Sequence, residues 1–557
     1  MAQSLKRALH SISTAKPFAC RSPQPNRRVT RLRAATQMAP TAADYARARE
    51  AFPYFQSEQD ADIAFMENAG GSQVPRCVVD AISEFFCKSY AQLGAGYGRS
   101  QRATRTVEEA HSWLEVFMNT KGQGQVVIGP STSQLAFNLA SAFADVLGPG
   151  DSIVLQEASH ESVLGPWVRL AGRNGCQLRW WRADRRSGAS ALSDLEASLD
   201  LSTRLVVVTH VSNILGEILD LASVVRLVRA RAPGAQVVAD GVAYAPHRAI
   251  DVAAWGVDWY LFSAYKVYGP HVGVMYGRRQ AYDSLLARGG QGPNHYFVSA
   301  DDLTYKFELG GANHEACAGL LALQDYLLHL LDQPHQPHQQ QQQHQQSRQE
   351  QQQQQGAQGQ QQQKAAVPSE TPEPAGGSHT ALRLPRVSRA EVEAAFALME
   401  AMEQPLQERL LSYLASHPAV RLVGPSYADP AVRVPTVSFV HRSKSSAAVA
   451  RDLQTAGFSV RCGHMYARRL LEALAEEGGL LAQEAAARQR SAGGDDLNGG
   501  DGTAAAAAAA DAGGGGAASA AFDVRRAVDE GVVRVTLLHY NTPEEVARLI
   551  AALETVL

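Results

Sequence analysis

Cysteine is scarce in this chain, and long apolar runs and a strong excess of either charge are missing. The six cysteines among 557 residues are scattered and form no CxxC pair. This argues against a zinc cluster or a disulfide scaffold and fits a reducing compartment. No apolar run approaches the ~20 residues needed to span a bilayer. The formal net charge of −3 provides no basic field, so we expect neither nucleic acid nor a membrane as a partner.

The first 43 residues lack acidic side chains altogether and are rich in Arg, Ser and Ala. This composition is typical of organelle transit peptides, so we interpret residues 1–40 as a removable leader. A chloroplast is favoured as the destination, with a mitochondrion as the alternative.

Two internal stretches contain few large apolar side chains. Residues 333–380 are dominated by Gln and His, and residues 480–521 by Ala and Gly. Neither can bury enough apolar surface to offset the entropy of ordering, so both are predicted to be disordered insertions. Expansion of a tolerant loop is favoured over partner binding for the first. The remainder divides into residues 41–332, an N-terminal segment with a large domain, and residues 381–479 with 522–557, a small C-terminal domain.

What the large domain does contain is a regular alternation of strand and helix patterns. Apolar runs such as "GQVVIG", "DSIVLQ", "TRLVVVTHVSN" and "AQVVADGVAY" alternate with segments of helical periodicity, such as "STSQLAFNLASAFADVL". This order predicts an α/β fold with a mostly parallel sheet covered on both faces. Ligands of such sheets bind beyond the carboxyl ends of the strands, so residues at those ends carry the most information.

Lys266 stands at one of these ends, between the apolar runs "WYLF" and "VGVMYG". A buried ammonium loses several kcal/mol of hydration unless it has a partner. A surface lysine is the ordinary interpretation. The alternative is a lysine kept neutral and nucleophilic for covalent catalysis with a carbonyl-bearing cofactor.

Polar residues mark the ends of the other predicted strands as well. Each has an ordinary explanation as a helix cap, a turn residue or a surface side chain. Each also suits a cofactor site: hydroxyls at a helix start for a phosphate, an imidazole for a ring, an amide, and a carboxylate for a protonated ring nitrogen. These residues are Thr132, Ser133, Gln134, His160, Asn213, Asp240 and Ser263.

In combination, these motifs resemble the class V aminotransferase superfamily of fold-type I pyridoxal phosphate enzymes, and in particular its cysteine desulfurase-like branch. The segments that carry the resemblance are "THVSNILG", "DGVAYAPHRAIDV", "FSAYKVYGPHVGVMYG" and "HYNT". The resemblance implies a large domain with a mostly parallel seven-stranded sheet and a small C-terminal α/β domain. It also implies pyridoxal 5'-phosphate as cofactor, a small α-amino acid as substrate and a homodimer.

The resemblance implies a role for each matching residue. Lys266 corresponds to the lysine that forms a Schiff base with the cofactor and abstracts the α-proton, Asp240 to the partner of the pyridine nitrogen, and His160 to the ring-stacking histidine. Arg534 corresponds to the arginine that binds the substrate carboxylate. The remaining matches are Asn213 for the phenolic oxygen, Thr132, Ser133, Gln134, Ser263 and Tyr265 for the phosphate, Asn68 and Ala69 for the substrate, and Asn294 for a neighbouring subunit's phosphate. Ala243 departs from the family, since many relatives have Gln or His there.

The position of the family's nucleophilic cysteine is the second departure, because the loop "VRCGHMYARRL" has Tyr466 there. Cys462 precedes it by four residues, up to ~13 Å along an extended chain. Three interpretations remain open. The favoured one is a transferase or lyase that needs no protein thiol and acts by transamination, elimination or epimerisation. The others are a true desulfurase using Cys462, and an inactive scaffold whose Gln-rich insertion binds a partner.

Overall fold

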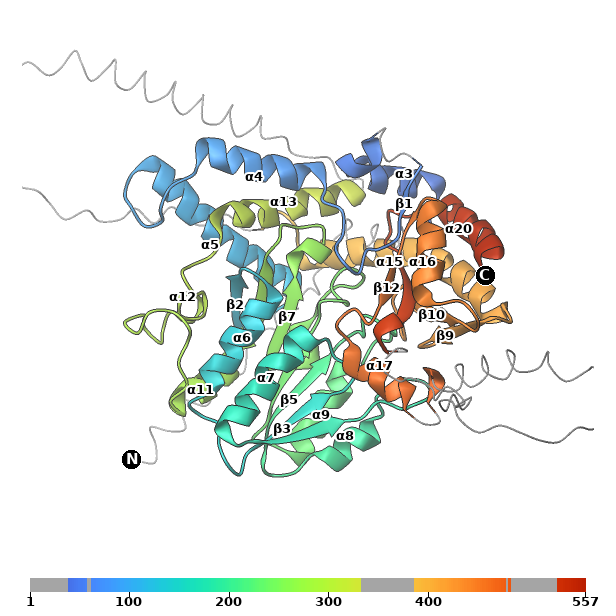
Figure 1. Cartoon of the computed structure of the whole chain (residues 1–557). Coiled ribbons are helices and arrows are strands. Elements are labelled where there is room, and N and C mark those ends of the chain that lie inside the picture. Colours follow the sequence, from blue (N-terminus) through green and yellow to red (C-terminus); the bar gives the residue numbers. More distant parts are fainter. Residues whose placement is uncertain (1–38, 58–61, 332–384, 477–478, 482–527) are drawn as a thin grey trace, which may run out of the picture.

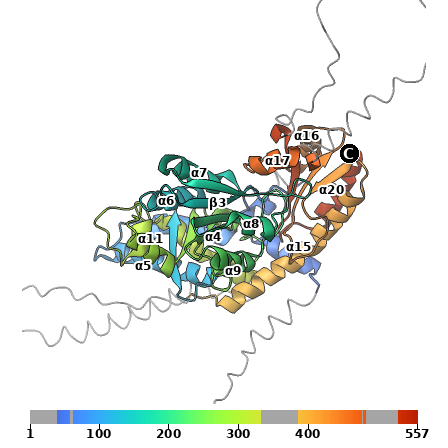
Figure 2. The same cartoon turned by 90° about the horizontal axis from the view of Figure 1, so that it is seen from below.

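The computed structural model describes residues 39–57, 62–331, 385–476, 479–481 and 528–557 (Figure 1). The predicted leader and the two predicted insertions fall almost entirely outside these described residues, so they stay predictions. Within the described parts, a large α/β domain lies beside a smaller one, as Figure 2 shows. No helix of these parts is long and apolar enough to cross a membrane.

A seven-stranded sheet forms the centre of the large domain, in the order β2-β8-β7-β6-β5-β3-β4. The pairs from β7 through β6, β5 and β3 to β4 are all parallel, whereas β8 runs antiparallel to both β2 and β7. The predicted fold class is confirmed. The strands are β2 (Gly124–Gly129), β3 (Ser152–Gln156), β4 (Gln177–Trp181), β5 (Thr203–Thr209), β6 (Gln236–Asp240), β7 (Trp259–Ser263) and β8 (Gly273–Arg278).

Helices cover both faces of this sheet, which is why its strands are apolar at almost every position. In β5, Val206 and Val208 face one core while Leu205 and Val207 face the other. The first core packs against α5 (Gly98–Met118), α9 (Leu221–Arg231) and α13 (His314–Leu330), and the second against α6 (Thr132–Phe143), α7 (Glu161–Asn174) and α11 (Arg279–Ala287). Further helices of this domain are α4 (Arg76–Lys88), α8 (Leu192–Ser198), α10 (Val252–Trp255) and α12 (Leu303–Phe307).

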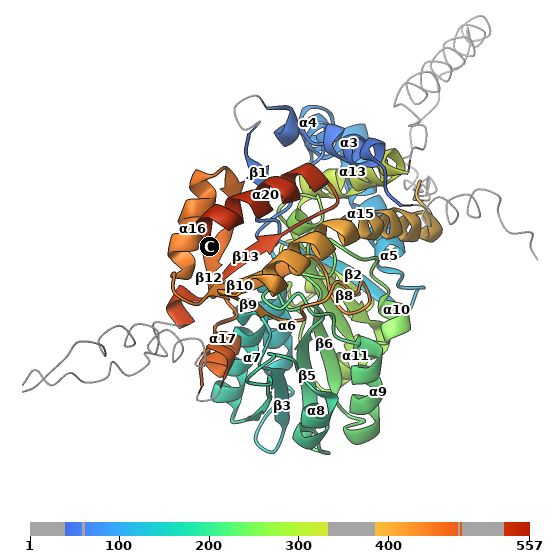
Figure 3. The same ribbon diagram turned by 90° about the vertical axis from the view of Figure 1, so that its right-hand side faces the viewer.

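The small domain is an antiparallel four-stranded sheet, in the order β12-β13-β10-β9, with helices packed against it. Its long helix α15 (Arg389–Ser416) begins at a capping box between Ser388 and Glu391 and also packs against the large domain (Figure 3). The strands are β9 (Val420–Val423), β10 (Thr436–His441), β12 (Arg461–Gly463) and β13 (Val532–Thr536), and the other helices are α16 (Ser446–Thr455), α17 (Arg468–Ala475) and α20 (Pro543–Val556).

The N-terminal segment contacts both domains. After α3 (Ala42–Glu50), the short strand β1 (Ala64–Phe65) pairs in parallel with β11 (Phe458–Ser459) of the small domain. The chain then passes to the large domain, where the Ser72 N–H donates to the Tyr265 carbonyl at 3.1 Å. The prediction groups this segment with the large domain, and the β1–β11 pairing, which joins residues almost four hundred positions apart, also connects it to the small domain.

Candidate active site

Strand ends of the large domain meet at one cavity, as the parallel topology requires. Asp240 ends β6, and Lys266 ends the single turn η3 (Ala264–Lys266) that follows β7. His160 caps α7 after β3, and Thr132 starts α6 after β2. The cavity measures about 210 Å³ and is lined by Ser131, Thr132, Ser133, His160, Ser162, Thr209, Val211, Asn213, Asp240, Val242, Ala243, Ser263, Tyr265, Lys266 and His271.

Lys266 is partly buried in the cavity wall. Among the described residues, no hydrogen bond or ion pair to its Nζ is found. Loss of hydration, reinforced by the positive charge of Arg534, lowers the pKa of Lys266 to about 8, while Asp240 and Glu67 act in the opposite direction. Roughly a tenth of this amine is therefore neutral at pH 7, far more than of an ordinary lysine, which fits the interpretation of a nucleophilic lysine between two apolar runs.

Asp240 is 4% exposed, and its Oδ1 accepts a hydrogen bond from the Val242 N–H at 2.9 Å. Burial raises the pKa of Asp240 to about 6, although the Val242 N–H and the charge of Lys266 oppose the rise. The carboxylate thus has unused acceptor capacity in a water-poor position. A cationic ligand nitrogen placed there would recover the lost hydration.

The imidazole of His160 is fixed by hydrogen bonds to Ser162, two positions later. Its Nδ1 accepts the Ser162 N–H at 3.1 Å and lies 2.7 Å from the Ser162 Oγ. Burial, with Lys266 and Arg534 as further causes, lowers the pKa of His160 to about 4. The ring is therefore neutral at physiological pH. Because Nδ1 accepts the Ser162 N–H, the proton is on Nε2.

The start of α6 forms a cup of hydroxyls and backbone N–H groups. Thr132 Oγ1 lies 2.7 Å from Ser263 Oγ, which joins the helix start to the end of β7. Gly273 allows this close approach, since a Cβ there would stand 2.4 Å from the Thr132 nitrogen. A helix N-terminus with hydroxyls is a site for a phosphate group.

Two aromatic residues extend this cup. The rings of Tyr265 and His271 lie 4.2 Å apart, and both line the cavity. Sequence reasoning missed His271, and its signal was its place five residues after Lys266 in "KVYGPH". Gln134 was predicted in this group, but its side chain is exposed and donates to Asn138 Oδ1 at 2.9 Å, away from the cavity lining.

The small domain borders this cavity through Arg534, which does not line it but donates a hydrogen bond to Asn213, a residue that does. Arg534 in β13 is 3% exposed and donates from one nitrogen to the Asn213 carbonyl at 3.2 Å, while another lies 3.4 Å from Glu67 Oε1. Its Nε is buried and has no hydrogen-bond partner among the residues that the structure describes. Burial lowers the pKa of Arg534 to about 10, with Glu67 acting in the opposite direction. An unused N–H on a buried guanidinium suits a carboxylate ligand.

A second arginine and a carboxylate accompany Arg534, and sequence reasoning missed both. Arg461 in β12 lies opposite Arg534 across the sheet, so the two side chains share a face. The Arg461 guanidinium lies 3.2 Å from the same Glu67 Oε1. Gly70 leaves room for this carboxylate, since a Cβ there would stand 2.3 Å from it. The place of Glu67 beside Asn68 in "FMENAGG" was the only local signal.

Asn68 and Ala69, predicted to touch substrate, are not among the residues that line the cavity. The Asn68 amide donates to the Thr536 carbonyl at 2.6 Å and to Asn541 Oδ1 at 3.1 Å, which joins the N-terminal segment to the small domain. Asn213 does line the cavity, and its amide donates to the Met465 carbonyl at 2.9 Å.

Cys462 and Tyr466 lie in different settings. Cys462 is opposite Val533 and packs with it against the large hydrophobic core, on the face of β12 away from Arg461. Burial raises the pKa of the Cys462 thiol, which lowers its reactivity. Tyr466 is 59% exposed, with its ring 5.2 Å from that of His160. The loop position near the cavity thus carries a phenol, and the thiol faces the core.

Comparisons with known proteins agree with this architecture. The aminotransferase class-V family matches residues 64–371. The aminotransferase-like protein FGM3 of Gibberella zeae is 32% identical over 515 residues, which cover 91% of this chain and 97% of that protein. A cysteine desulfurase of Dickeya dadantii is 32% identical over 291 residues, covering 50% of this chain and 70% of that protein.

Among solved structures, the apo cysteine desulfurase from Thermococcus onnurineus NA1 superposes with a TM-score of 0.62 at 21% identity, covering 93% of this chain and 99% of that one. The chain belongs to the class V aminotransferase family, in its cysteine desulfurase-like branch. It is a pyridoxal phosphate-dependent enzyme. The cavity fits this cofactor, because an unpartnered amine, a buried carboxylate and a helix start face the same space.

Proposed function

We propose that this enzyme acts on a small α-amino acid by removing the α-proton, without using a protein thiol. The observation that carries the proposal is the pairing of an unpartnered Lys266, whose pKa is lowered to about 8, with a buried arginine that has a free N–H. Pyridoxal phosphate, when bound, supplies an aldehyde for covalent attachment and a ring that accepts electrons from the α-carbon.

In this proposal the large-domain residues hold the cofactor. Lys266 would be its point of attachment, Asp240 would pair with the pyridine nitrogen, and His160 would contact the ring. Thr132 and Ser133 at the start of α6, with Ser263 and Tyr265, would hold the phosphate. Asn213 lines the same cavity, and its amide would leave Met465 to reach the phenolic oxygen.

The substrate is held between the two domains. Arg534 would bind the α-carboxylate, with its unpartnered Nε–H as one of the donors. The neutral Lys266 amine then takes the α-proton as a general base. Its pKa of about 8 lies near the working pH, where a base is most effective. Transamination, elimination and epimerisation all follow from this step.

The orientation of Cys462 favours these reactions over a persulfide mechanism. A cysteine desulfurase needs a thiolate that reaches the substrate sulfur. The Cys462 side chain instead packs against the core, and its thiol pKa is raised. Release of sulfur from an amino acid by β-elimination would need no protein thiol.

The test is exchange of the α-proton in D2O, followed by NMR for a panel of amino acids. Exchange reports proton removal whatever happens next, so it does not presuppose the product. We expect exchange with at least one L-amino acid and its loss in Lys266→Ala. Absence of exchange across the panel would overturn the proposal and favour an inactive scaffold. Alanine and transferable sulfur from cysteine, both lost in Cys462→Ser, would favour the desulfurase.

We also propose a homodimer. Tyr296 and Phe297 are 95% and 72% exposed, which is unusual for aromatic side chains and suits a protein interface. Asn294 is buried beside them, and its amide donates to the carbonyls of Tyr305 and Glu308, both at 2.7 Å. Within this subunit the Asn294 amide therefore stabilises the loop before α12, and its predicted contact with a neighbouring subunit's phosphate stays a prediction. Sedimentation of wild type and Tyr296→Ser/Phe297→Ser tests this, and a monomeric wild type would contradict it.

The chloroplast remains our proposed location, carried by the composition of residues 1–40. A fusion of residues 1–40 to a fluorescent protein tests it. We expect chloroplast import, and mitochondrial or diffuse fluorescence would contradict it.

A further inference from the structure

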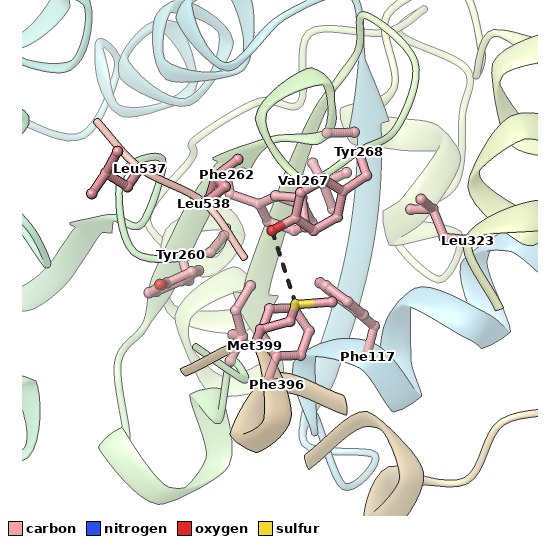
Figure 4. Close-up of a cluster of buried hydrophobic side chains, with 14 of the residues drawn as sticks. Phe117, Tyr260, Phe262, Val267, Tyr268, Leu323, Phe396, Met399, Leu537 and Leu538 are labelled. Carbon is pink, nitrogen blue, oxygen red and sulfur yellow. Dashed lines mark hydrogen bonds between the residues drawn. The ribbon is translucent and has the colours of Figure 1, made fainter. Parts of the chain in front are cut away.

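The turn that carries Lys266 continues into a residue with an unusual backbone. Tyr268 has φ of +62°, in the left-handed region that non-glycine residues rarely adopt. Such a conformation costs free energy and persists only where the surroundings fix it. Tyr268 is also fully buried, at 1% exposure, among Phe262, Met399 and Leu323 (Figure 4).

The backbone of this turn is held by the N-terminal segment. Ser72 Oγ accepts the Tyr268 N–H at 2.8 Å and donates to the Tyr265 carbonyl at 3.1 Å. The Ser72 N–H donates to the same carbonyl at 3.1 Å. One serine thus bridges the residues on both sides of Lys266 and Val267.

At the other end of the Tyr268 side chain, the hydroxyl is also hydrogen-bonded. It donates to the Pro246 carbonyl at 2.7 Å and lies 3.2 Å from His539 Nδ1. Met399 Sδ makes a longer contact with the same oxygen, at 3.9 Å (Figure 4). Because the hydroxyl proton is directed to Pro246, the His539 Nδ1–H must donate to the Tyr268 oxygen.

With its proton on Nδ1, His539 has a free acceptor at Nε2, and the Tyr326 hydroxyl donates to it. Burial lowers the pKa of His539 to about 3, so the ring stays neutral and keeps one donor and one acceptor. The hydrogen bonds therefore run in one direction, from Tyr326 through His539 and Tyr268 to Pro246. This chain joins α13, the C-terminal segment, the lysine turn and the loop after Asp240.

We propose that Tyr268 is a positioning residue for Lys266, with Ser72 as its partner. Held at both the N–H and the hydroxyl, Tyr268 keeps the turn in the conformation that directs the Lys266 amine into the cavity. The proposal rests on the proposed role of Lys266. The hydroxyl of Tyr268 matters here, whereas its ring fills the core.

The test measures the Lys266 amine itself in cofactor-free protein. Acetylation by acetic anhydride at a series of pH values, read by mass spectrometry of the Lys266 peptide, gives the apparent pKa of this amine. Wild type should titrate near the value of about 8. In Tyr268→Phe the loosened turn lets the amine reach water, so its pKa should rise by about one unit and its reactivity at pH 7 fall roughly tenfold. Ser72→Ala should shift it in the same direction, by less.

Two control variants separate positioning from general destabilisation. Tyr282 is a buried tyrosine whose hydroxyl has no partner, so Tyr282→Phe should leave the Lys266 pKa unchanged. Tyr326→Phe removes a hydroxyl from the same chain but leaves both Tyr268 hydroxyl contacts in place, and it should shift the Lys266 pKa little. An unchanged pKa in Tyr268→Phe, or an equal shift in Tyr326→Phe, would overturn the proposal.

Activity provides a second readout in the loaded enzyme. A displaced lysine slows proton transfer more than substrate binding, so Tyr268→Phe should lower kcat roughly tenfold to hundredfold with KM nearly constant. A rise in KM alone would contradict positioning. If wild type shows no turnover, the proposed function fails, while the acetylation result still decides the role of Tyr268.

Discussion

The large domain lines the cavity, and the small domain borders it through Arg534; these two sides, called here the large-domain wall and the small-domain wall, are built in different ways. The large-domain wall consists of residues at or shortly after the ends of buried strands, such as Asp240 at the end of β6 and Lys266 in the turn after β7. The small-domain wall depends on antiparallel pairing, which brings Arg461 opposite Arg534. The first wall thus follows from local sequence and the second from long-range pairing. In the proposed function, the first wall holds the cofactor and the second recognises the substrate.

The walls also differ in how their charges are balanced. Lys266, Asp240 and His160 all have pKa values shifted against their charged forms, with burial as the largest cause. Burial likewise lowers the pKa of Arg534 to about 10, but Arg534 and Arg461 share the Glu67 carboxylate. The large-domain wall is therefore costly to fold without a ligand, whereas the small-domain wall is partly neutralised in advance.

The largest expected effect is at Lys266. Lys266→Ala removes both the attachment point and the general base, so α-proton exchange should fall by more than ~10³-fold. The measurement is NMR exchange at equal cofactor content. Exchange within tenfold of wild type would show that another base on either wall does this work.

Asp240→Asn should show how much the buried Asp240 carboxylate in the large-domain wall lowers the free energy of unfolding. The pKa of Asp240 in the folded protein, about 6, lies above its ordinary 3.8, so folding penalises the ionised carboxylate. This cost is absent below pH 3.8, grows as the pH rises to about 6, and is complete above that. At pH 7 cofactor-free Asp240→Asn should be more stable by up to about 3 kcal/mol.

Urea unfolding of the cofactor-free proteins checks this prediction at two pH values. The stability difference between Asp240→Asn and wild type should be present at pH 7 and nearly vanish near pH 4. In the loaded enzyme the order should reverse, because the variant loses the ionic partner of the pyridine nitrogen. Equal stability of the two proteins at pH 7 would show that the ionised Asp240 carboxylate does not destabilise the folded state.

Arg534→Lys tests whether the small-domain wall binds the substrate carboxylate. A lysine keeps the charge but loses the fork, so KM should rise roughly tenfold to hundredfold with a smaller change in kcat. Arg461→Lys is the matched variant on the neighbouring strand, where the side chain is half exposed, and KM should change less than ~5-fold. Steady-state kinetics measures both. Equal effects would contradict the assignment of the carboxylate to Arg534.

The smallest effect is expected at Cys462. Its side chain packs in the core, so Cys462→Ser should change turnover by less than ~2-fold at equal fold stability. Product assays with L-cysteine check this. Loss of sulfide or alanine production in this variant alone would assign Cys462 to the reaction.

Most residues of the large-domain wall could be predicted because they stand at or soon after the end of an apolar run, whereas His271 was missed. Asp240 and Lys266 need no tertiary knowledge to be placed at a strand end. The antiparallel direction of β8 was not foreseen, since a buried strand carries no signal of direction.

Fewer residues of the small-domain wall could be predicted from the sequence, for a physical reason. Arg534 was found by resemblance, but Glu67 and Arg461 meet it only through the β12–β13 pairing and the packing of the N-terminal segment. The direction of the Cys462 side chain likewise depends on strand register, which a one-residue slip would reverse. The predicted roles of all the site residues stay predictions, and Gln134, Asn68, Ala69 and Arg534 are not among the residues that line the cavity.

The central claim is that Lys266 is the attachment point of the cofactor. Borohydride reduction of the loaded enzyme, proteolysis and mass spectrometry locate the lysine that carries the pyridoxyl group. The account predicts the label on the peptide containing Lys266, with no such label in Lys266→Ala. A label on another lysine, or no specific label, would contradict it.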